Sequence, residues 1–146
     1  MNNLTNAALC PETWIDGSSV GLGCLLFNSS IDFTWEEANN FCQFTSNATL
    51  LEILTEEQLV FTQLELTRLA EEEGGGRNWW SSGTDVGRNG VWLWATSCNP
   101  VSDFVWIPGY PYNPDNHNCM TINYKHGFLG SDEMCFYENP PICHRK

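Results

Sequence analysis

The chain has 146 residues, of which 42% are hydrophobic, 13% aromatic and 16% charged, a composition that favours one globular domain over a disordered, coiled-coil or collagen-like chain. Six Lys and Arg residues oppose 18 Asp and Glu residues, and the net charge of −12 repels nucleic-acid phosphates and anionic lipid headgroups. The longest apolar runs, such as VWLWA at 91–95, are too short to span a bilayer, so we expect neither nucleic-acid binding nor membrane insertion.

The cysteines and glycosylation sequons both indicate an oxidising compartment. The seven cysteines include no CxxC pair, which disfavours zinc-finger and thioredoxin-like sites and favours disulfides. Sequons begin at Asn3, Asn28 and Asn47, and a sequon is meaningful only in a chain that enters the secretory pathway. We therefore predict a secreted, extracellular glycoprotein with an N-terminal tail at 1–9 and one domain at 10–146.

The segment that follows Ile31 predicts a first helix. Thr34 is followed three residues later by Glu37, which is the spacing of a capping box. Apolar residues then recur at helical spacing on one face as far as Cys42. This helix is expected to bury that cysteine.

A second helix is predicted to begin after Thr55, which forms another capping-box pair with Gln58. The glycines at 74–76 are expected to end it. Its apolar side is predicted to comprise Leu59, Phe61, Leu64, Leu66 and Leu69.

The sequence after these glycines predicts short strands separated by turns. The expected strands are RNWWSSGTD at 77–85, GVWLWATS at 90–97, FVWIP at 104–108, CMTINY at 119–124 and PPICHRK at 140–146. GSSVG at 17–21 matches a nucleophile-elbow pattern, but it lies within the short Cys10 to Cys24 segment and is expected to be a hairpin turn. Helices early and strands late predict an α+β domain, and we expect no enzyme.

An ordered series of cysteine, tryptophan and proline motifs resembles the C-type lectin-like domain from residue 10 to residue 145, and is most similar to secreted arthropod lectins of innate recognition. The motifs are CPETW, WEEANNFC, ATLLEI, WWSSGTD, GVWLWATS, WIPGYP, NCMTI, GSDEMC and PPICHRK. The resemblance implies two helices, two small antiparallel sheets and a long ligand-binding loop. It also implies the disulfides Cys10–Cys24, Cys42–Cys143 and Cys119–Cys135, a choice among pairings that cysteine spacing alone leaves open.

Cys98 has no partner in this set. An exposed odd cysteine in an oxidising compartment favours pairing with a second chain, which here would give a disulfide-linked dimer. The alternative is a buried free thiol that packs as a small hydrophobic side chain. Both interpretations stay open at the level of sequence.

The core signature of the family departs from its usual form in this chain. Where the family commonly has Trp-Ile-Gly-Leu, the sequence reads Trp80-Ser81-Ser82-Gly83. Small polar residues at these positions predict a looser or rearranged strand within an otherwise intact fold.

The calcium and sugar ligands of the family are mostly replaced. Sugar-binding members hold calcium with Glu-Pro-Asn or Gln-Pro-Asp in the loop and with Asn-Asp before a cysteine, and six to eight oxygens surround the ion. The matching positions here read Tyr110-Pro111-Tyr112 and Gly130-Ser131-Asp132. Asp132 alone keeps a carboxylate, and a second common calcium position carries His144 in place of glutamate. The retained proline implies a cis Tyr110–Pro111 bond.

A non-standard calcium site is one alternative to no cofactor at all. Its ligands would be Asp132, Ser131 and Glu133, supplemented by nearby oxygens of Asp115, Asn116 and Asn118. The other interpretation is that Asn and Asp beside prolines are turn residues. Zinc bound through His117 and Asp115 is a further, weaker alternative.

The loop carries aromatic side chains at the positions of the lost ligands. A tyrosine offers a flat apolar face and a hydroxyl, which suits a sugar ring or the hot spot of a protein partner. We expect Trp106 to be core, and the tyrosines either bind ligand or pack the loop on itself. The predicted function is binding of glycans or microbial surfaces, with calcium-independent protein binding as the alternative. The candidate ligand-binding residues are Tyr110, Pro111, Tyr112, Asp115, Asn116, Asn118 and Tyr124.

Overall fold

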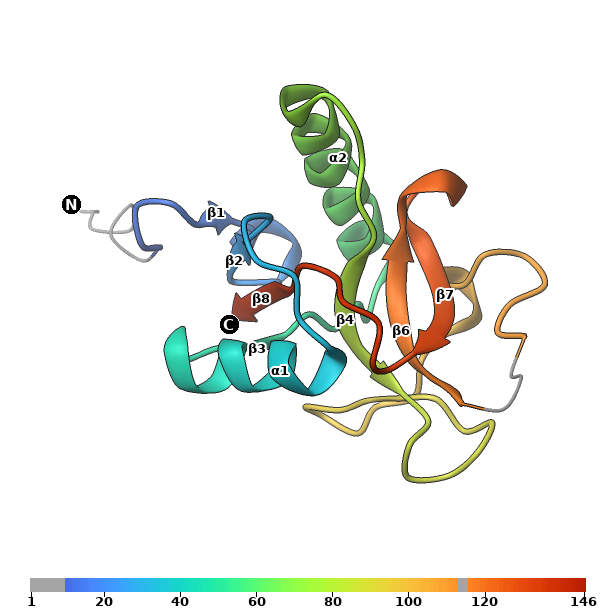
Figure 1. The fold of residues 1–146 in the computed structure, drawn as a ribbon. Helices are drawn as coiled ribbons and strands as arrows, with labels where there is room; N and C mark the ends of the chain where they lie inside the picture. Colours follow the sequence, from blue (N-terminus) through green and yellow to red (C-terminus); the bar gives the residue numbers. More distant parts are fainter. Residues whose placement is uncertain (1–9, 113–115) are drawn as a thin grey trace.

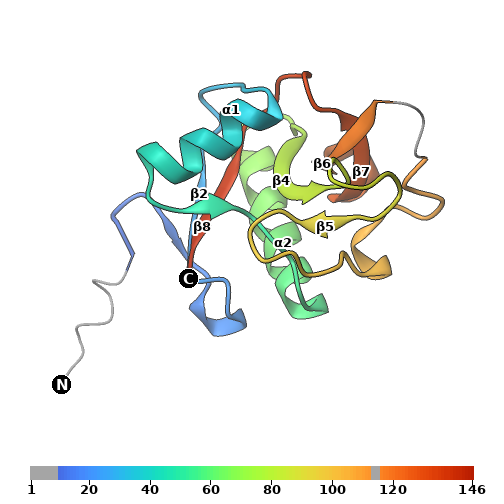
Figure 2. The same cartoon turned by 90° about the horizontal axis from the view of Figure 1, so that it is seen from below.

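A computed structural model describes residues 10–112 and 116–146; the sequon at Asn3 and the candidate ligand Asp115 lie outside these ranges. The chain forms two sheets of four strands each. Figures 1 and 2 show the sheets side by side, with helix α1 over the first sheet and helix α2 beside β4. This is the α+β architecture that the sequence predicts.

The first sheet joins the two ends of the domain. Its order is β1 (Ile15–Asp16), β2 (Cys24–Phe27), β8 (Ile142–Arg145) and β3 (Thr49–Leu50), and all neighbours are antiparallel. The prediction of helices early and strands late missed β1, β2 and β3. Strands of two to four residues are too short to show an alternating pattern.

The GSSVG segment lies in the connection between β1 and β2. Residues Ser18–Val20 form a single 3-10 turn that is capped by Gly21 at φ 82°. A left-handed backbone at this position favours glycine. The expectation of a turn is therefore confirmed.

The second sheet carries the long loop. Its order is β5 (Leu93–Trp94), β4 (Trp79–Thr84), β6 (His117–Asn123) and β7 (Leu129–Met134). The prediction of a strand at FVWIP is wrong, because Asp103–Val105 is a 3-10 turn and Trp106 makes only an isolated bridge to Gly130. Val105 and Trp106 are nevertheless buried. The apolar residues of this segment are therefore buried in a loop and do not form a strand.

Strand β4 buries both unusual serines of the core signature, and Ser81 makes a hydrogen bond there. Trp79 to Gly83 are all buried, and the Ser81 hydroxyl donates to the Met120 carbonyl of β6 at 3.1 Å. The predicted rearrangement is limited to a register shift between Trp80 and Thr84 in the pairing with β6. The hydroxyl therefore replaces an apolar contact with a buried hydrogen bond.

Helix α1 (Trp35–Asn40) begins as the sequence predicts. Thr34 Oγ1 accepts from the Glu37 N–H at 3.3 Å, and Glu37 Oε1 accepts from the Thr34 N–H at 3.0 Å. The helix continues into a π-helical turn at Phe41–Thr45 that holds Cys42 fully buried. The capping box and the buried cysteine are both confirmed.

Helix α2 (Glu56–Glu73) is capped by Thr55 at its start and by Gly74 at φ 76°. Thr55 Oγ1 accepts from the Gln58 N–H at 3.1 Å. In a capping box the Gln58 side chain would accept from the Thr55 N–H. Here Gln58 Oε1 instead accepts from the Leu54 N–H at 2.7 Å. Gln58 Nε2 also donates to the Val20 carbonyl at 3.0 Å, so this side chain ties the helix to the turn after β1.

The buried face of α2 is partly polar. Leu59 and Leu66 are buried, but Gln58 and Thr62 occupy the other inward positions, where Thr62 Oγ1 donates to the Gln58 carbonyl. Leu64, predicted to be on the apolar side, is 65% exposed. That part of the prediction is wrong because Leu64 lies five residues after Leu59, about 140° around the helix from it, whereas the buried Leu66 lies within about 20° of Leu59.

The main core lies between α2 and the two sheets. Trp92 and Trp106 pack edge to face with ring centroids 4.9 Å apart, and both are buried. Trp106 is therefore a core residue, as predicted. Side chains with no exposed surface include Leu25, Leu51, Ile53, Trp94, Met120, Ile122 and Ile142.

The structure contains the three disulfides that the family resemblance implied: Cys10–Cys24, Cys42–Cys143 and Cys119–Cys135. The second bond joins the π-helical turn after α1 to strand β8 across a sequence separation of 101 residues. It closes most of the domain into one covalent loop. Cys98 is a free thiol and is exposed, so the alternative of a buried thiol is wrong.

Replacing Cys42 and Cys143 together with alanine should lower the free energy of unfolding by about 4.7 kcal/mol, because a loop of this length contributes that much in the chain-entropy model. Urea denaturation at neutral pH measures the change. Cys98→Ser is the matched control and should alter stability by less than about 0.5 kcal/mol, since its thiol is exposed. A double variant whose free energy of unfolding falls by less than about 1 kcal/mol would contradict the chain-entropy model.

Candidate functional site

The orange segment at 104–112 of the long loop lies beside β7, on the side of the second sheet that faces away from α1 (Figures 1 and 2). The Ile107 N–H donates to the Gly130 carbonyl at 3.0 Å, and the Tyr110 N–H donates to the Ile107 carbonyl at 2.9 Å. These bonds hold the loop against β7 immediately before Ser131 and Asp132. The two segments that resemble the family's ligand positions are therefore adjacent in space.

Tyr110 and Tyr112 form a stacked pair on either side of a cis Tyr110–Pro111 bond. Their ring centroids are 4.4 Å apart and their planes are inclined by 20°. Tyr110 is half-buried and packs on the main core, whereas Tyr112 is 66% exposed. One tyrosine thus packs the loop on itself, and it supports the other in an outward position.

Asp132 fixes the loop backbone at this pair. The residue is 2% exposed, and its Oδ1 accepts from the Tyr112 N–H at 3.0 Å. His117 Nδ1 lies 3.1 Å from the Asp132 carbonyl oxygen and 3.7 Å from Oδ2. The carboxylate that the family uses for calcium therefore serves here as a buried anchor for the loop.

Ser131 points away from this anchor. Its Oγ is 2.8 Å from Thr121 Oγ1 and 3.3 Å from Asn123 Nδ2, and the residue is 1% exposed. Successive side chains of a strand point to opposite faces of the sheet. The structure therefore does not bring Ser131 and Asp132 together as two ligands of one ion.

Acidic and aromatic groups interact electrostatically at the exposed end of the pair. Burial raises the pKa of Glu133 above its ordinary value, and the charge of Asp132 raises it further, against an opposing effect of His117. A hydrogen bond with Tyr112 raises the pKa of Tyr110, and Asp132 and Glu133 add to this shift. We call these five residues, Tyr110, Tyr112, His117, Asp132 and Glu133, whose charges influence one another, the polar cluster.

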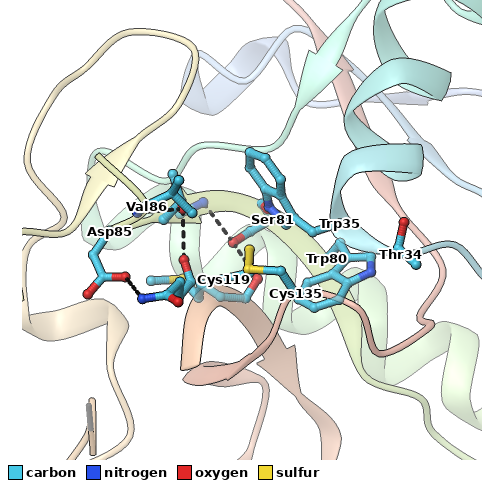
Figure 3. The surroundings of a disulfide bond; sticks show 12 residues. Thr34, Trp35, Trp80, Ser81, Asp85, Val86, Cys119 and Cys135 are labelled. Carbon is cyan, nitrogen blue, oxygen red and sulfur yellow. Dashed lines mark hydrogen bonds between the residues drawn. A yellow bond between two sulfur atoms is a disulfide. The ribbon is translucent and has the colours of Figure 1, made fainter. Parts of the chain in front are cut away.

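Asn118 is held by a residue that the sequence analysis did not single out. Its Nδ2 donates to Asp85 Oδ1 at 2.8 Å, and Asp85 Oδ2 accepts from the Gly90 N–H at 2.8 Å. Asp85 follows β4 and precedes a glycine-rich turn, which is the only sequence signal for this role. In Figure 3, Asp85 lies on one side of the Cys119–Cys135 disulfide, and Trp35 and Trp80 lie on the other.

Asn116 and Tyr124 lie outside the polar cluster. Asn116 is exposed at the start of β6 with φ 74°, a left-handed turn conformation that Asn tolerates. Tyr124 packs on Phe128 with centroids 5.6 Å apart, and its ring lies so close to Gly76 that a Cβ there would overlap it. Tyr124 is thus placed beside the end of α2 and not on the Tyr112 ring.

Calcium does not fit the side chains at this position. The ion requires six to eight oxygen ligands, but Asp132 Oδ1 already accepts from the loop backbone, and Ser131 faces the other side of β7. Within residues 10–112 and 116–146, no three His, Cys, Asp or Glu side chains are grouped to hold a metal. Asp115, which the sequence assigned to both the calcium and the zinc alternatives, lies outside these ranges.

The second family calcium position is occupied by hydrogen bonds of the protein itself. His144 is 2% exposed; its Nδ1 lies 3.0 Å from the Leu22 carbonyl and its Nε2 lies 3.4 Å from the Glu52 nitrogen. Lys146 Nζ donates to Glu52 Oε1 at 2.8 Å. Burial opposes ionisation of Glu52, but hydrogen bonds from Lys146 and Ser97 outweigh it and lower the pKa of Glu52. The lysine therefore supplies the positive charge beside this carboxylate.

The remaining sequons differ in exposure. Asn47 is exposed, with φ 51°, after the π-helical turn. Asn28 is half-buried, and its Oδ1 accepts from the Ser30 N–H at 3.2 Å. Glycosylation at Asn28 and Asn47 stays a prediction, as it does at Asn3.

The fold and the site define a disulfide-bonded lectin-type domain with an altered ligand loop. The family model described as the lectin C-type domain matches residues 32–145, and the chain belongs to this family. A search of curated proteins finds no match. In the described part of the chain, no helix has the length and hydropathy needed to cross a membrane.

Three solved structures illustrate the range of similar proteins. Human lithostathine has 25% identity and a TM-score of 0.79, with coverage of 100% of this chain and 96% of that chain. A calcium-independent type II antifreeze protein has 21% identity, a TM-score of 0.74 and 93% coverage of both chains. Murine dendritic cell inhibitory receptor 2, solved in complex with N-glycan, has 22% identity, a TM-score of 0.75 and coverage of 94% and 98%. The narrower resemblance to arthropod lectins stays a prediction.

Stability should fall as the pH falls below about 6.5, because burial lowers the pKa of His144 beneath its ordinary value of 6.5. The unfolded chain then binds a proton before the folded chain does, so this contribution is present at pH 7.5 and is lost as the pH falls toward the folded pKa. Urea denaturation between pH 7.5 and 5 measures the slope.

His144→Gln should flatten this slope, since Gln does not titrate and still offers one donor and one acceptor. The exposed His126 provides the control, and His126→Gln should retain the slope of the parent protein. An unchanged slope in His144→Gln would show that another group causes the acid sensitivity.

Proposed function

We propose that this protein is a secreted recognition domain that binds a glycan or a microbial surface ligand through the Tyr112 ring, without a calcium bridge. The observation that supports the proposal is the pair of stacked tyrosines. Tyr112 is 66% exposed, its ring rests on Tyr110, and its backbone is fixed by the buried Asp132. A ring that is already ordered loses little conformational entropy when a ligand binds.

The chemistry around the ring suits a sugar. The apolar face of a tyrosine packs on the C–H face of a pyranose, and hydroxyl groups at the rim of the sugar need donors and acceptors. Glu133 and His117 are both partly exposed and belong to the polar cluster. They are the proposed hydrogen-bonding partners of the sugar hydroxyls, and neither requires a metal.

A calcium-independent protein-binding domain with no sugar activity is the second candidate. The hydrogen bonds of Asp132 and Ser131 favour this candidate, because both residues stand at positions that orient sugar hydroxyls in the family and both are here bonded within the protein. An exposed tyrosine is also a common anchor in protein interfaces. The similar structures include an antifreeze protein, so the fold is not restricted to sugar ligands.

The family and the disulfides support the extracellular setting of the proposal, since disulfide-rich domains of this kind are typically extracellular. The exposed thiol of Cys98 is consistent with a disulfide-linked dimer, which stays a prediction. The family is generally non-enzymatic, and a recognition role without catalysis belongs to the same proposal.

Millimolar calcium should leave the melting temperature unchanged to within about 1 °C. A ligand that binds only the folded state stabilises it by RT ln(1 + [L]/Kd), and the Asp132 carboxylate already accepts from the loop backbone. Differential scanning fluorimetry with calcium and with chelator measures the shift. A rise of several degrees that Asp132→Asn abolishes would contradict the calcium-independent proposal.

Tyr112→Ala should weaken ligand binding roughly tenfold, equivalent to about 1.4 kcal/mol, while the melting temperature changes little because the ring is largely exposed. A glycan array with calcium and with chelator identifies the ligand and then compares the variants. Phe44→Ala is the control, since Phe44 is 81% exposed and lies in the turn after α1. If the parent protein binds no glycan under either condition, the protein-binding candidate replaces the lectin proposal.

A further inference from the structure

The outward face of α2 carries an apolar groove that the fold does not explain. Six residues line this groove, which has a volume of about 380 Å³: Val20, Glu56, Glu57, Val60, Phe61 and Leu64. Val60 is 51% exposed and Leu64 is 65% exposed. Residues four positions apart lie on the same side of a helix, so these two side chains form one ridge.

The core does not require this ridge. The inward face of α2 consists of Gln58, Leu59, Thr62 and Leu66, all of which are buried. A single exposed apolar residue is ordinary in proteins. Here two of them adjoin the partly buried Phe61 and Val20 across the helix and the turn after β1, and the apolar surface is therefore continuous.

The charge beside the groove is negative. Glu56 and Glu57 line it and are exposed, and in the described part of the chain neither forms an ion pair. Arg68 is the only basic residue of α2, and it is bound by Glu65 at 3.0 Å and Glu72 at 2.6 Å. The groove thus combines an apolar floor with carboxylates that have no cation of their own.

A second copy of this chain is a poor occupant. Pairing two grooves would bring Glu56 and Glu57 of both copies together in molecules that each carry a net charge of −12, and like charges at close range oppose association. A basic partner gains from the same charges.

We propose that this groove docks a basic, amphipathic helical segment of another protein. Its apolar residues pack between Val60 and Leu64, and its Lys or Arg side chains lie opposite Glu56 and Glu57. Helix-in-groove recognition of this kind uses apolar anchors at i, i+3 and i+4. The surface does not include Tyr112 or the polar cluster, so the interaction is independent of the proposed lectin function.

A labelled synthetic peptide of about 18 residues, with Leu and Lys placed at helical spacing, serves as the probe in fluorescence anisotropy. Leu64→Ser should weaken its binding at least tenfold, because a leucine anchor is lost from the contact. Glu56→Gln combined with Glu57→Gln should weaken binding several-fold at low salt, and this effect should shrink as salt screens the charges. Circular dichroism should show an unchanged fold, since all three positions are exposed.

Two controls separate the groove from general attraction to an acidic protein. Phe44→Ser removes an exposed apolar side chain elsewhere, and Glu71→Gln removes an exposed carboxylate from the other end of α2. Equal binding by all variants, or no binding by the parent protein, would overturn the proposal. Sedimentation that reveals a dimer dissociated by Leu64→Ser would also overturn it and assign the groove to a second copy.

Discussion

The domain depends on the antiparallel insertion of β8 between β2 and β3. This pairing places residues from the two ends of the chain in register, with Leu25 opposite His144 and Leu26 opposite Cys143, and the Cys42–Cys143 bond makes it covalent. Every segment between residues 50 and 142 is thereby held as a closed loop. Substitutions in the second sheet and its long loop therefore leave the domain closed, because the strand pairing and the disulfide that close it lie in the first sheet.

The same closure accounts for the buried polar residues near the C-terminal end of the described chain. His144 lies in β8 and Glu52 lies two residues after β3, and Lys146 reaches back to the Glu52 carboxylate. A buried carboxylate without a counter-charge is costly. In this chain Lys146 supplies the counter-charge, whereas the family often uses a calcium ion near this region. The positive charge there therefore comes from the polypeptide itself.

Local signals predicted the parts of the fold that local interactions determine. Thr34 and Glu37 lie within one helical turn, and their spacing alone specifies a cap. Leu64 was misassigned because its apolar side chain was given more weight than its spacing, which sets it about 140° around the helix from Leu59. The inward place of Gln58 was not predictable in this way, because its amide binds a carbonyl 38 residues away in sequence. At the site, the motif positions identified Asp132 and Tyr112 as neighbours. Their hydrogen bond, and the separate place of Tyr124, depend on tertiary packing that spacing does not encode.

The contact between Asp132 and residue 112 is made through the backbone N–H of Tyr112 and not through its side chain. Any residue other than proline supplies that donor. The shape of the loop is therefore separable from the chemistry that the loop presents. A family that keeps this anchor is free to exchange the side chain at 112 for a larger ring, an amide or a charge, and so to change its ligand while the scaffold stays the same.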